Sequence, residues 1–253
     1  MESFKRVDIL GCPFDVISFN ETAEWVKRAV LDNGRLQVVP GSIDFVMRSR
    51  RDPVFARELW QSDLVVAVGQ PIVWAASLLG DPLRKRVSGT DLVWRCAEIS
   101  NEIGCTVALI GGKYEITVEA AQKMIERYPN AKLVPIETPF PLGEKENAEV
   151  VRRIKSIDAK IVLAALGAPR QERWVQSHLG ASGANVGIGI GSAFDIISGR
   201  NPRAPGWMQA LGLEWFYRML QEPKRLGRRY LVDDSPFLIL LPVEIVRRKL
   251  KRL

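Results

Sequence analysis

Hydrophobic residues along this chain gather in short continuous runs that alternate with segments of helical periodicity. Six runs have the length of strands, and they span residues 36–39, 63–68, 106–112, 131–136, 159–167 and 185–191. They lack the polar–apolar alternation of a strand with one wet face. Continuous apolar character is typical of parallel strands that are covered on both faces. We therefore predict six buried strands in a mostly parallel sheet.

Helical patterns lie between these runs, for example at residues 21–34, 115–129 and 147–157. Strands and helices that alternate in this way predict an α/β fold with a doubly wound, Rossmann-like sheet. The alternation stops near Ser198, and the rest of the chain is helical, basic and aromatic. We expect a core of residues 1–198 and a C-terminal appendage of residues 199–253.

The charge of the chain is concentrated at its C-terminal end. Residues 218–253 contain ten basic and four acidic residues, whereas the remaining 217 contain 26 basic and 25 acidic residues. A nucleic-acid-binding protein usually has a broader basic face. RNA binding is therefore disfavoured, and we expect no nucleic-acid partner.

The last twelve residues, PVEIVRRKLKRL, have the composition of an amphipathic basic helix. We predict that it begins at Pro242, because proline suits the first helical position. Val243, Val246, Leu250 and Leu253 then share one apolar face. Such a face either packs on the protein body or lies in an anionic membrane interface, and the dense basic charge favours the membrane. The appendage should therefore associate with a membrane.

Several function classes are disfavoured by residues that the chain lacks. Cys12, Cys96 and Cys105 are far apart and form no CxxC pair, and His178 is the only histidine. We therefore expect no disulfide framework and no metal site. No apolar run reaches the ~20 residues that cross a bilayer, and the first residues lack the apolar core of a signal peptide. These features predict a cytoplasmic protein.

Three turns follow predicted strands at the positions where open parallel sheets bind ligands. In the first, Gly111 and Gly112 allow the backbone to approach a ligand, and Lys113 precedes a helix whose first N–H groups attract phosphate. In the second, Gln171 is placed to hold a base edge or a hydroxyl, with helix capping as the alternative. In the third, Asp195 is placed to bind a ribose or sugar hydroxyl, or to cap a helix. Together the turns predict a nucleotide-like ligand.

The segments RVSGTDL, VALIGGK, GAPRQERW and GSAFDIISGRNPRAPGWMQALGLEWFYRMLQEPKRLGRRYL closely resemble the WecG/TagA/CpsF family of bacterial glycosyltransferases. The likeness runs from about residue 7 to about residue 237. It implies transfer of a sugar from a UDP-sugar to an undecaprenyl-diphosphate-linked sugar acceptor, with inversion and without a metal cofactor. It also implies a role in cell-surface polysaccharide synthesis, such as that of cell wall or exopolysaccharide. The enzyme would be peripheral, on the inner face of the cell membrane.

The resemblance implies roles for three arginines of the appendage. Arg218, Arg225 and Arg228 match family residues that close over the site and stabilise the diphosphate. Guanidinium groups bind phosphate oxygens in pairs, and they would supply the charge that a metal supplies in other glycosyltransferases. If the segment is one helix, spacings of seven and three place them on one face, although Pro223 is positioned to break it.

The sequence departs from the family where the catalytic base is expected. That aspartate is Val68 here, although Gly69, Gln70 and Pro71 follow as in the family. Valine cannot accept a proton, and a general base typically contributes ~10²–10⁴-fold. An earlier turn also differs, with Pro40 and Ser42 in place of threonine and asparagine.

Several explanations for Val68 remain open. Asp44, Asp91 or Glu137 could replace the base, or the acceptor's own diphosphate or a sugar carboxylate could assist. Alternatively, the chain is a catalytically impaired member that binds UDP-sugar or lipid, or the valine is an engineered change. The sequence also leaves open the donor sugar and any oligomeric state. Lys113 or Arg170 is placed to neutralise a donor that carries a carboxylate.

Overall fold

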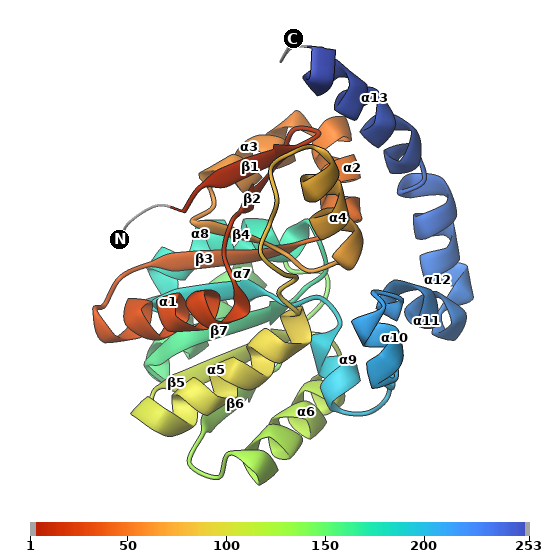
Figure 1. Ribbon diagram of the computed structural model, residues 1–253. Coiled ribbons are helices and arrows are strands. Elements are labelled where there is room, and N and C mark those ends of the chain that lie inside the picture. The colour runs from red at the N-terminus through yellow and green to blue at the C-terminus, as the bar shows by residue number, and fades with distance from the viewer. Residues whose placement is uncertain (1–3, 251–253) are drawn as a thin grey trace. The chain divides into compact units, whose positions relative to one another are not determined.

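Six strands form one sheet in the computed structural model, which describes residues 4–250 apart from the side chains of Ala210 and Arg225 (Figure 1). The strand order is β4-β3-β8-β7-β5-β6. The strands are β3 (Leu36–Gly41), β4 (Leu64–Ala67), β5 (Thr106–Gly111), β6 (Lys132–Ile136), β7 (Ala159–Ala165) and β8 (Val186–Gly189). The ladders β3–β8, β8–β7, β7–β5 and β5–β6 are parallel. Each predicted apolar run overlaps one of these strands, and the predicted α/β fold is confirmed.

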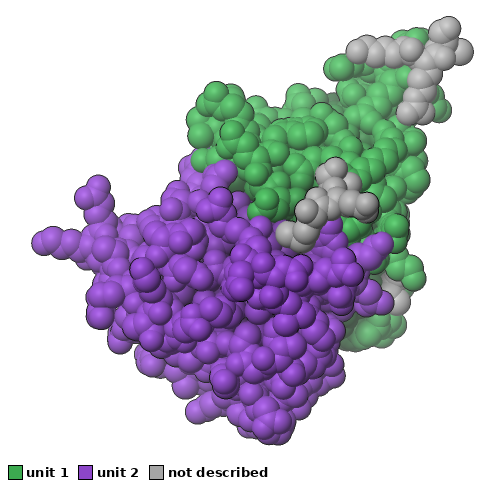
Figure 2. Space-filling view, turned by 90° about the vertical axis from the view of Figure 1, so that its left-hand side faces the viewer, with its two compact units in different colours: residues 1–18, 40–88, 203–253 green, residues 19–39, 89–202 purple. Residues whose placement is uncertain are grey.

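The chain divides into two compact units, which Figure 2 colours separately. Unit 1 comprises residues 1–18, 40–88 and 203–253, and unit 2 comprises residues 19–39 and 89–202. The chain passes from unit 2 to unit 1 within β3. The predicted division into a core of residues 1–198 and an appendage of 199–253 stays a prediction.

Unit 2 contains β5 to β8, the first part of β3 and six helices. The helices are α1 (Phe19–Leu31), α5 (Gly89–Ile103), α6 (Tyr114–Arg127), α7 (Glu144–Ser156), α8 (Arg170–Ser182) and α9 (Ala193–Ile197). Helix α5 packs against α1 and α6, whereas α7 packs against α8. Ile154 of α7 and Trp174 of α8 belong to the same buried cluster as Val162 of β7. The strands carry uninterrupted runs of apolar residues because helices cover the sheet.

Unit 1 begins with an antiparallel hairpin that the hydrophobic pattern does not predict. Its strands are β1 (Arg6–Ile9) and β2 (Cys12–Asp15). The buried carboxylate of Asp15 accepts hydrogen bonds from Arg6 Nε and Nη2, both at 2.9 Å, and from the backbone N–H of Val65 at 2.7 Å. Asp15 therefore joins the hairpin to β4.

Apart from β4 and the end of β3, the remaining elements of unit 1 are helical. They are α2 (Ile43–Arg51), α3 (Pro53–Gln61), α4 (Gln70–Leu78), α10 (Gly206–Ala210), α11 (Glu214–Gln221), α12 (Pro223–Arg228), a π-helical turn η1 (Arg229–Asp233), and α13 (Pro236–Leu250). The prediction that the last helix begins at Pro242 is wrong. Pro236 occupies the first position, and Pro242 lies inside the helix. Both prolines suit a helix start, and the apolar residues between them extend the helix. Within residues 4–250, no helix has the length and apolar character required to cross a membrane.

We predict that Asp15→Asn lowers the free energy of unfolding by about 3 kcal/mol, because removing one partner of a buried ion pair leaves the other uncompensated. The urea midpoint of the purified protein measures the effect. Asp32→Asn, at an exposed position, is the control and should leave the midpoint unchanged. Equal midpoints for the two variants would contradict the structural role of Asp15.

Candidate active site

The carboxyl ends of β5, β7 and β8 form an edge of the sheet in unit 2 that is rich in glycine. Gly111 has φ +83°, and an added Cβ would lie 2.6 Å from the carbonyl oxygen of Ala165 at the end of β7. Gly112, with φ +68°, donates its N–H to the same oxygen at 3.0 Å. Glycine is required at position 111 because a side chain would collide with the neighbouring strand. The predicted Gly111–Gly112 turn therefore lies directly beside the end of β7.

Gln171 connects two further turns of this edge. Its Oε1 accepts the N–H of Gly167 at 3.1 Å and the N–H of Gly191 at 3.2 Å. Its Nε2 donates to Glu172 Oε1 at 2.7 Å, and both side chains are 3% exposed. These contacts hold the turns after β7 and β8 together. Gln171 therefore holds the turns at this edge of the sheet in place through hydrogen bonds within the protein.

The other predicted residues of unit 2 lie around the same strands. Lys113 is exposed at the start of α6, and Asp195 is half-buried in α9 after β8. Glu137 is exposed immediately after β6, and Asp91 lies in the first turn of α5. Arg170 stacks its guanidinium over the ring of Phe140 at 4.5 Å. Parallel strands thus bring Gly111, Gly112, Lys113, Gln171 and Asp195 to one edge.

A second cluster of polar residues lies in unit 1, where α2 follows β3. Arg229 of η1 donates from Nη2 to Ser42 Oγ at 3.1 Å, and the same nitrogen lies 3.6 Å from Asp44 Oδ2. Arg48 donates to both carboxylate oxygens of Asp44, at 3.1 and 3.2 Å. Asp44, a predicted base, is 7% exposed. Two guanidinium groups therefore surround its carboxylate.

Asp234 completes this cluster. Its Oδ2 lies 3.6 Å from Arg229 Nε, its side chain is 7% exposed, and Oδ1 makes no hydrogen bond within residues 4–250. Burial raises the pKa of Asp234 to about 6, and Arg229 opposes this rise. The Asp234 N–H bonds to the carbonyl of Arg229 at 2.8 Å, five residues back. The π-helical turn thereby places the carboxyl beside the guanidinium.

The predicted arginine face is interrupted. Helix α11 ends at Gln221, and Glu222 has φ −127° and ψ 61°, outside the helical region. Arg218 lies on α11 and is half-buried, whereas Arg228 lies on α12 and is exposed. Arg225 is in α12, and its side chain lies outside the described part of the structure. Pro223 begins the second helix, so the three arginines do not share the face of one helix.

Val68 lies next to the turn after β3. Its N–H donates to the carbonyl of Gly41 at 2.9 Å, and Gly41 precedes Ser42. Val68, at the position where the sequence comparison leads us to expect an aspartate, is therefore one backbone hydrogen bond from the turn that Arg229 contacts. An added Cβ on Gly212 would lie 2.8 Å from Gln70, so the loop before α11 packs closely on the start of α4.

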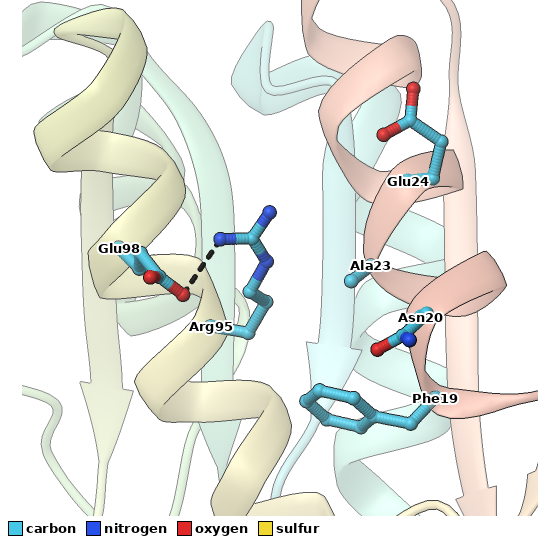
Figure 3. A pocket seen from close by; sticks show the side chains of 6 residues that line it. All are labelled: Phe19, Asn20, Ala23, Glu24, Arg95 and Glu98. Carbon is cyan, nitrogen blue, oxygen red and sulfur yellow. Dashed lines mark ion pairs between the residues drawn. The ribbon is translucent and has the colours of Figure 1, made fainter.

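A surface hollow of about 360 Å³ lies in unit 2 between α1 and α5 (Figure 3). Phe19, Asn20 and Ala23 line it from α1. From α5, Arg95 lies 2.6 Å from Glu98 and 2.8 Å from Glu102. Carboxylates already neutralise the arginine, so the hollow does not offer a phosphate site.

The thiols and acids offer no second centre within the described residues. Cys12, Cys96 and Cys105 are free and buried, and burial raises the pKa of Cys96 to about 12. No three His, Cys, Asp or Glu side chains in residues 4–250 form a group that could hold a metal ion.

Sequence reasoning missed Arg48, Arg229 and Asp234. Arg228–Arg229 and Asp233–Asp234 are doublets, and their order along the chain does not show which member faces inward. The π-helical turn changes the helical phase between them. An uninterrupted helical projection would therefore place these side chains incorrectly.

Comparison with known proteins identifies the relatives of the chain. Residues 7–252 match the glycosyl transferase WecG/TagA/CpsF family. An N-acetylglucosaminyldiphosphoundecaprenol N-acetyl-beta-D-mannosaminyltransferase of Staphylococcus aureus (strain MW2) is 30% identical over 250 residues, which cover 98% of this chain and 95% of the relative. The protein of the same name from strain MRSA252 is 28% identical over 249 residues, with the same coverage.

We predict that the contribution of Asp234 to the stability of the protein falls as pH rises from about 4 to about 6. The folded pKa of Asp234, about 6, exceeds the unfolded value of about 3.9, so protonation stabilises the folded state and this contribution is lost as pH rises. Asp234→Asn should remove the dependence, so the variant gains stability relative to the unaltered protein across this window. Thermal midpoints between pH 4 and pH 8 measure it, with Asp233→Asn as the control. A constant difference in midpoint across this range would contradict the raised pKa.

Proposed function

Because the chain belongs to the WecG/TagA/CpsF family of glycosyltransferases, we propose that it transfers a sugar from a UDP-sugar to an acceptor sugar on polyprenyl diphosphate. The match over residues 7–252 carries this proposal. The names of the relatives supply the first substrates to test, an N-acetylmannosamine donor and an N-acetylglucosaminyl-diphosphoundecaprenol acceptor. Such a product would belong to the synthesis of a cell-surface polysaccharide.

We assign the donor to the glycine-rich edge of unit 2. Helix α6 begins without a side-chain cap at Lys113, so its first N–H groups are oriented for an anion. Gly111 and Gly112 let the diphosphate approach the backbone, and Asp195 accepts hydrogen bonds from sugar hydroxyls. Gln171 keeps the adjacent turns in place. The exposed ammonium of Lys113 neutralises part of the donor charge.

Departure of UDP requires stabilisation of negative charge. Arg218, Arg225 and Arg228 supply guanidinium groups for the diphosphate, which bind phosphate oxygens at two points. This stabilisation acts where charge develops in the transition state. We propose on this basis that the transfer uses no metal cofactor, and from the family resemblance that it inverts the anomeric centre.

We propose that α13 rests on an anionic membrane surface. Ile239, Val243, Val246 and Leu250 form a stripe in which each side chain is at least 56% exposed. Arg248, on another side of the helix, binds Asp81 at 3.3 Å and the carbonyl of Asp8 at 2.7 Å. The polar side therefore faces unit 1 and leaves the apolar stripe outward, which suits an interfacial helix. Leu253, also predicted on this face, lies outside the described residues.

Val68 supports a second candidate function. With valine at the expected base position, the chain could bind UDP-sugar or lipid without transferring sugar. Sugar transfer and binding without transfer both require the donor to bind, but only the first gives turnover.

We predict that Arg228→Ala lowers kcat about 10²-fold, because one donor to the developing charge is lost. The assay follows transfer from UDP-sugars, beginning with the N-acetylmannosamine donor, to a short-chain lipid-diphosphate-sugar. Arg152→Ala, on the exposed face of α7, is the control and should retain full activity. A full rate for Arg228→Ala would contradict its role. UDP-sugar binding without turnover by the unaltered protein would identify the binding function instead.

We predict that Val243→Asp with Val246→Asp weakens binding to vesicles of anionic lipid at least tenfold. Each exposed valine would bury apolar surface in the interface, and burial of such a side chain contributes about 1.5 kcal/mol or more. Co-sedimentation with vesicles measures the effect. Leu31→Asp replaces an exposed leucine of α1 and should bind as the unaltered protein does. Equal binding by all three proteins would exclude α13 as the contact.

A further inference from the structure

The buried carboxyl group of Asp234 has one oxygen atom that makes no hydrogen bond to any described group. Its Oδ2 faces Arg229 Nε at 3.6 Å, whereas Oδ1 is buried and makes no hydrogen bond within residues 4–250. A buried polar atom without a partner costs free energy, and native structures usually satisfy such atoms. Oδ1 therefore has an unused lone pair, which a hydroxyl group reaches only after the side chains that cover it move aside.

Arg229 connects Asp234 to the turn where the family base is missing. Its Nη2 donates to Ser42 Oγ at 3.1 Å. Ser42 follows Gly41, whose carbonyl accepts the N–H of Val68 at 2.9 Å. Both ends of this chain of contacts belong to unit 1. A carboxyl group held by Arg229 thus lies in the same cluster as the turn beside Val68.

The charges around Asp234 come from two elements. Arg229 and Asp233 belong to η1, while Asp44 and Arg48 belong to α2. Burial and the two other carboxylates raise the pKa of Asp234 to about 6, and the two arginines oppose them. A carboxyl group with this value is ionised at neutral pH and still basic enough to receive a proton, as general catalysis requires.

Asp44 is less suited to this task, although it lies in the same cluster. Arg48 Nη2 donates to both of its oxygens, and Arg229 Nη2 lies 3.6 Å from Oδ2. These contacts occupy part of the acceptor capacity of Asp44, whereas Oδ1 of Asp234 makes no hydrogen bond to a described group. Asp44 instead orients Arg229, which in turn faces Asp234.

The surroundings of Asp234 also suit an acceptor that arrives from a lipid surface. Leu231 and Val232, three and two residues before it, are 71% and 60% exposed. An apolar surface that rests on lipid would bring the head of a lipid-linked sugar close to Asp234. The carboxyl group of Asp234 would then lie within three residues of the side chains that contact the lipid.

We propose that Asp234 is the general base of sugar transfer and replaces the carboxylate that is absent at Val68. The inference rests on the proposed function. Asp234 Oδ1 accepts the proton of the acceptor hydroxyl, whose oxygen forms the new bond to the anomeric carbon. The bond from that carbon to the diphosphate oxygen breaks, and its electron pair leaves with the nucleoside diphosphate. Asp234 then releases the proton to water.

The test compares Asp234→Asn with Asp233→Asn, each in the unaltered chain and in a Val68→Asp background. Transfer from the N-acetylmannosamine donor to a short-chain lipid-diphosphate-sugar gives kcat, and calorimetry with UDP gives donor-site affinity. Asp233 is a matched control because it is the adjacent carboxylate and is 44% exposed beside Arg51. Thermal midpoints establish that each variant is folded.

We expect Asp234→Asn to lower kcat at least ~10²-fold without changing UDP affinity. The decline of the rate below pH about 6 should disappear with it. In the Val68→Asp background, the same substitution should cost less than about fivefold, because the restored carboxylate serves as base. Asp233→Asn should retain activity at neutral pH in both backgrounds, with the decline of the rate in the unaltered background moved slightly to lower pH, because Asp233 helps to raise the pKa of Asp234.

Two results would overturn the assignment of the base. Activity within about threefold after Asp234→Asn would do so, as would an equal loss in both backgrounds, which indicates a structural role. If Asp234→Asn does not fold, the pH dependence of kcat of the unaltered chain tests the assignment instead. A kcat that is independent of pH between 5 and 7 would exclude Asp234 as the base. An unaltered chain that transfers no sugar contradicts the proposed function itself, and the base assignment with it.

Discussion

Parallel alignment of the strands is the constraint on which the glycine-rich edge of this protein depends. Parallel strands direct their carboxyl ends to one edge, so the turns after β5, β7 and β8 meet there. The edge is crowded, and an added Cβ at Gly111 would lie 2.6 Å from a neighbouring carbonyl oxygen. Gln171 then links the turns through Gly167 and Gly191. Contacts within the protein therefore determine the shape of this edge.

The basic residues of the C-terminal segment divide into those that anchor the segment and those that are exposed. Arg229 and Arg248 pair with acidic groups of unit 1, which anchors this segment to α2 and to the loop after α4. Arg228 and Lys249 are exposed. Net charge alone therefore overstates the number of cations that can meet a phosphate or a lipid head group. The division between anchoring and exposed cations follows from the positions of the acids.

Two carboxyl groups of one cluster illustrate how surroundings determine chemistry. Asp44 accepts hydrogen bonds from Arg48 and lies beside Arg229. Among the described residues, Asp234 forms one ion pair, with Arg229, and its Oδ1 makes no hydrogen bond, while burial raises its pKa to about 6. Asp44 therefore serves to hold the arginines in place. Asp234 has the properties of a group that exchanges protons near neutral pH.

The sequence by itself determined the sheet, the glycine turns and the family. Apolar runs and helical periods are local signals, and the six runs became β3 to β8. The tertiary structure alone decided the hairpin β1–β2, because Asp15 holds it through Arg6 and Val65, which are distant from one another in sequence. It also decided that α13 begins at Pro236 and that Gln171 bonds to two turns. Arg229 was hidden because its partner Asp44 is 185 residues away, and Asp234 was hidden because its role depends on that placement of Arg229. Contacts over such separations depend on packing, and no local pattern reports them.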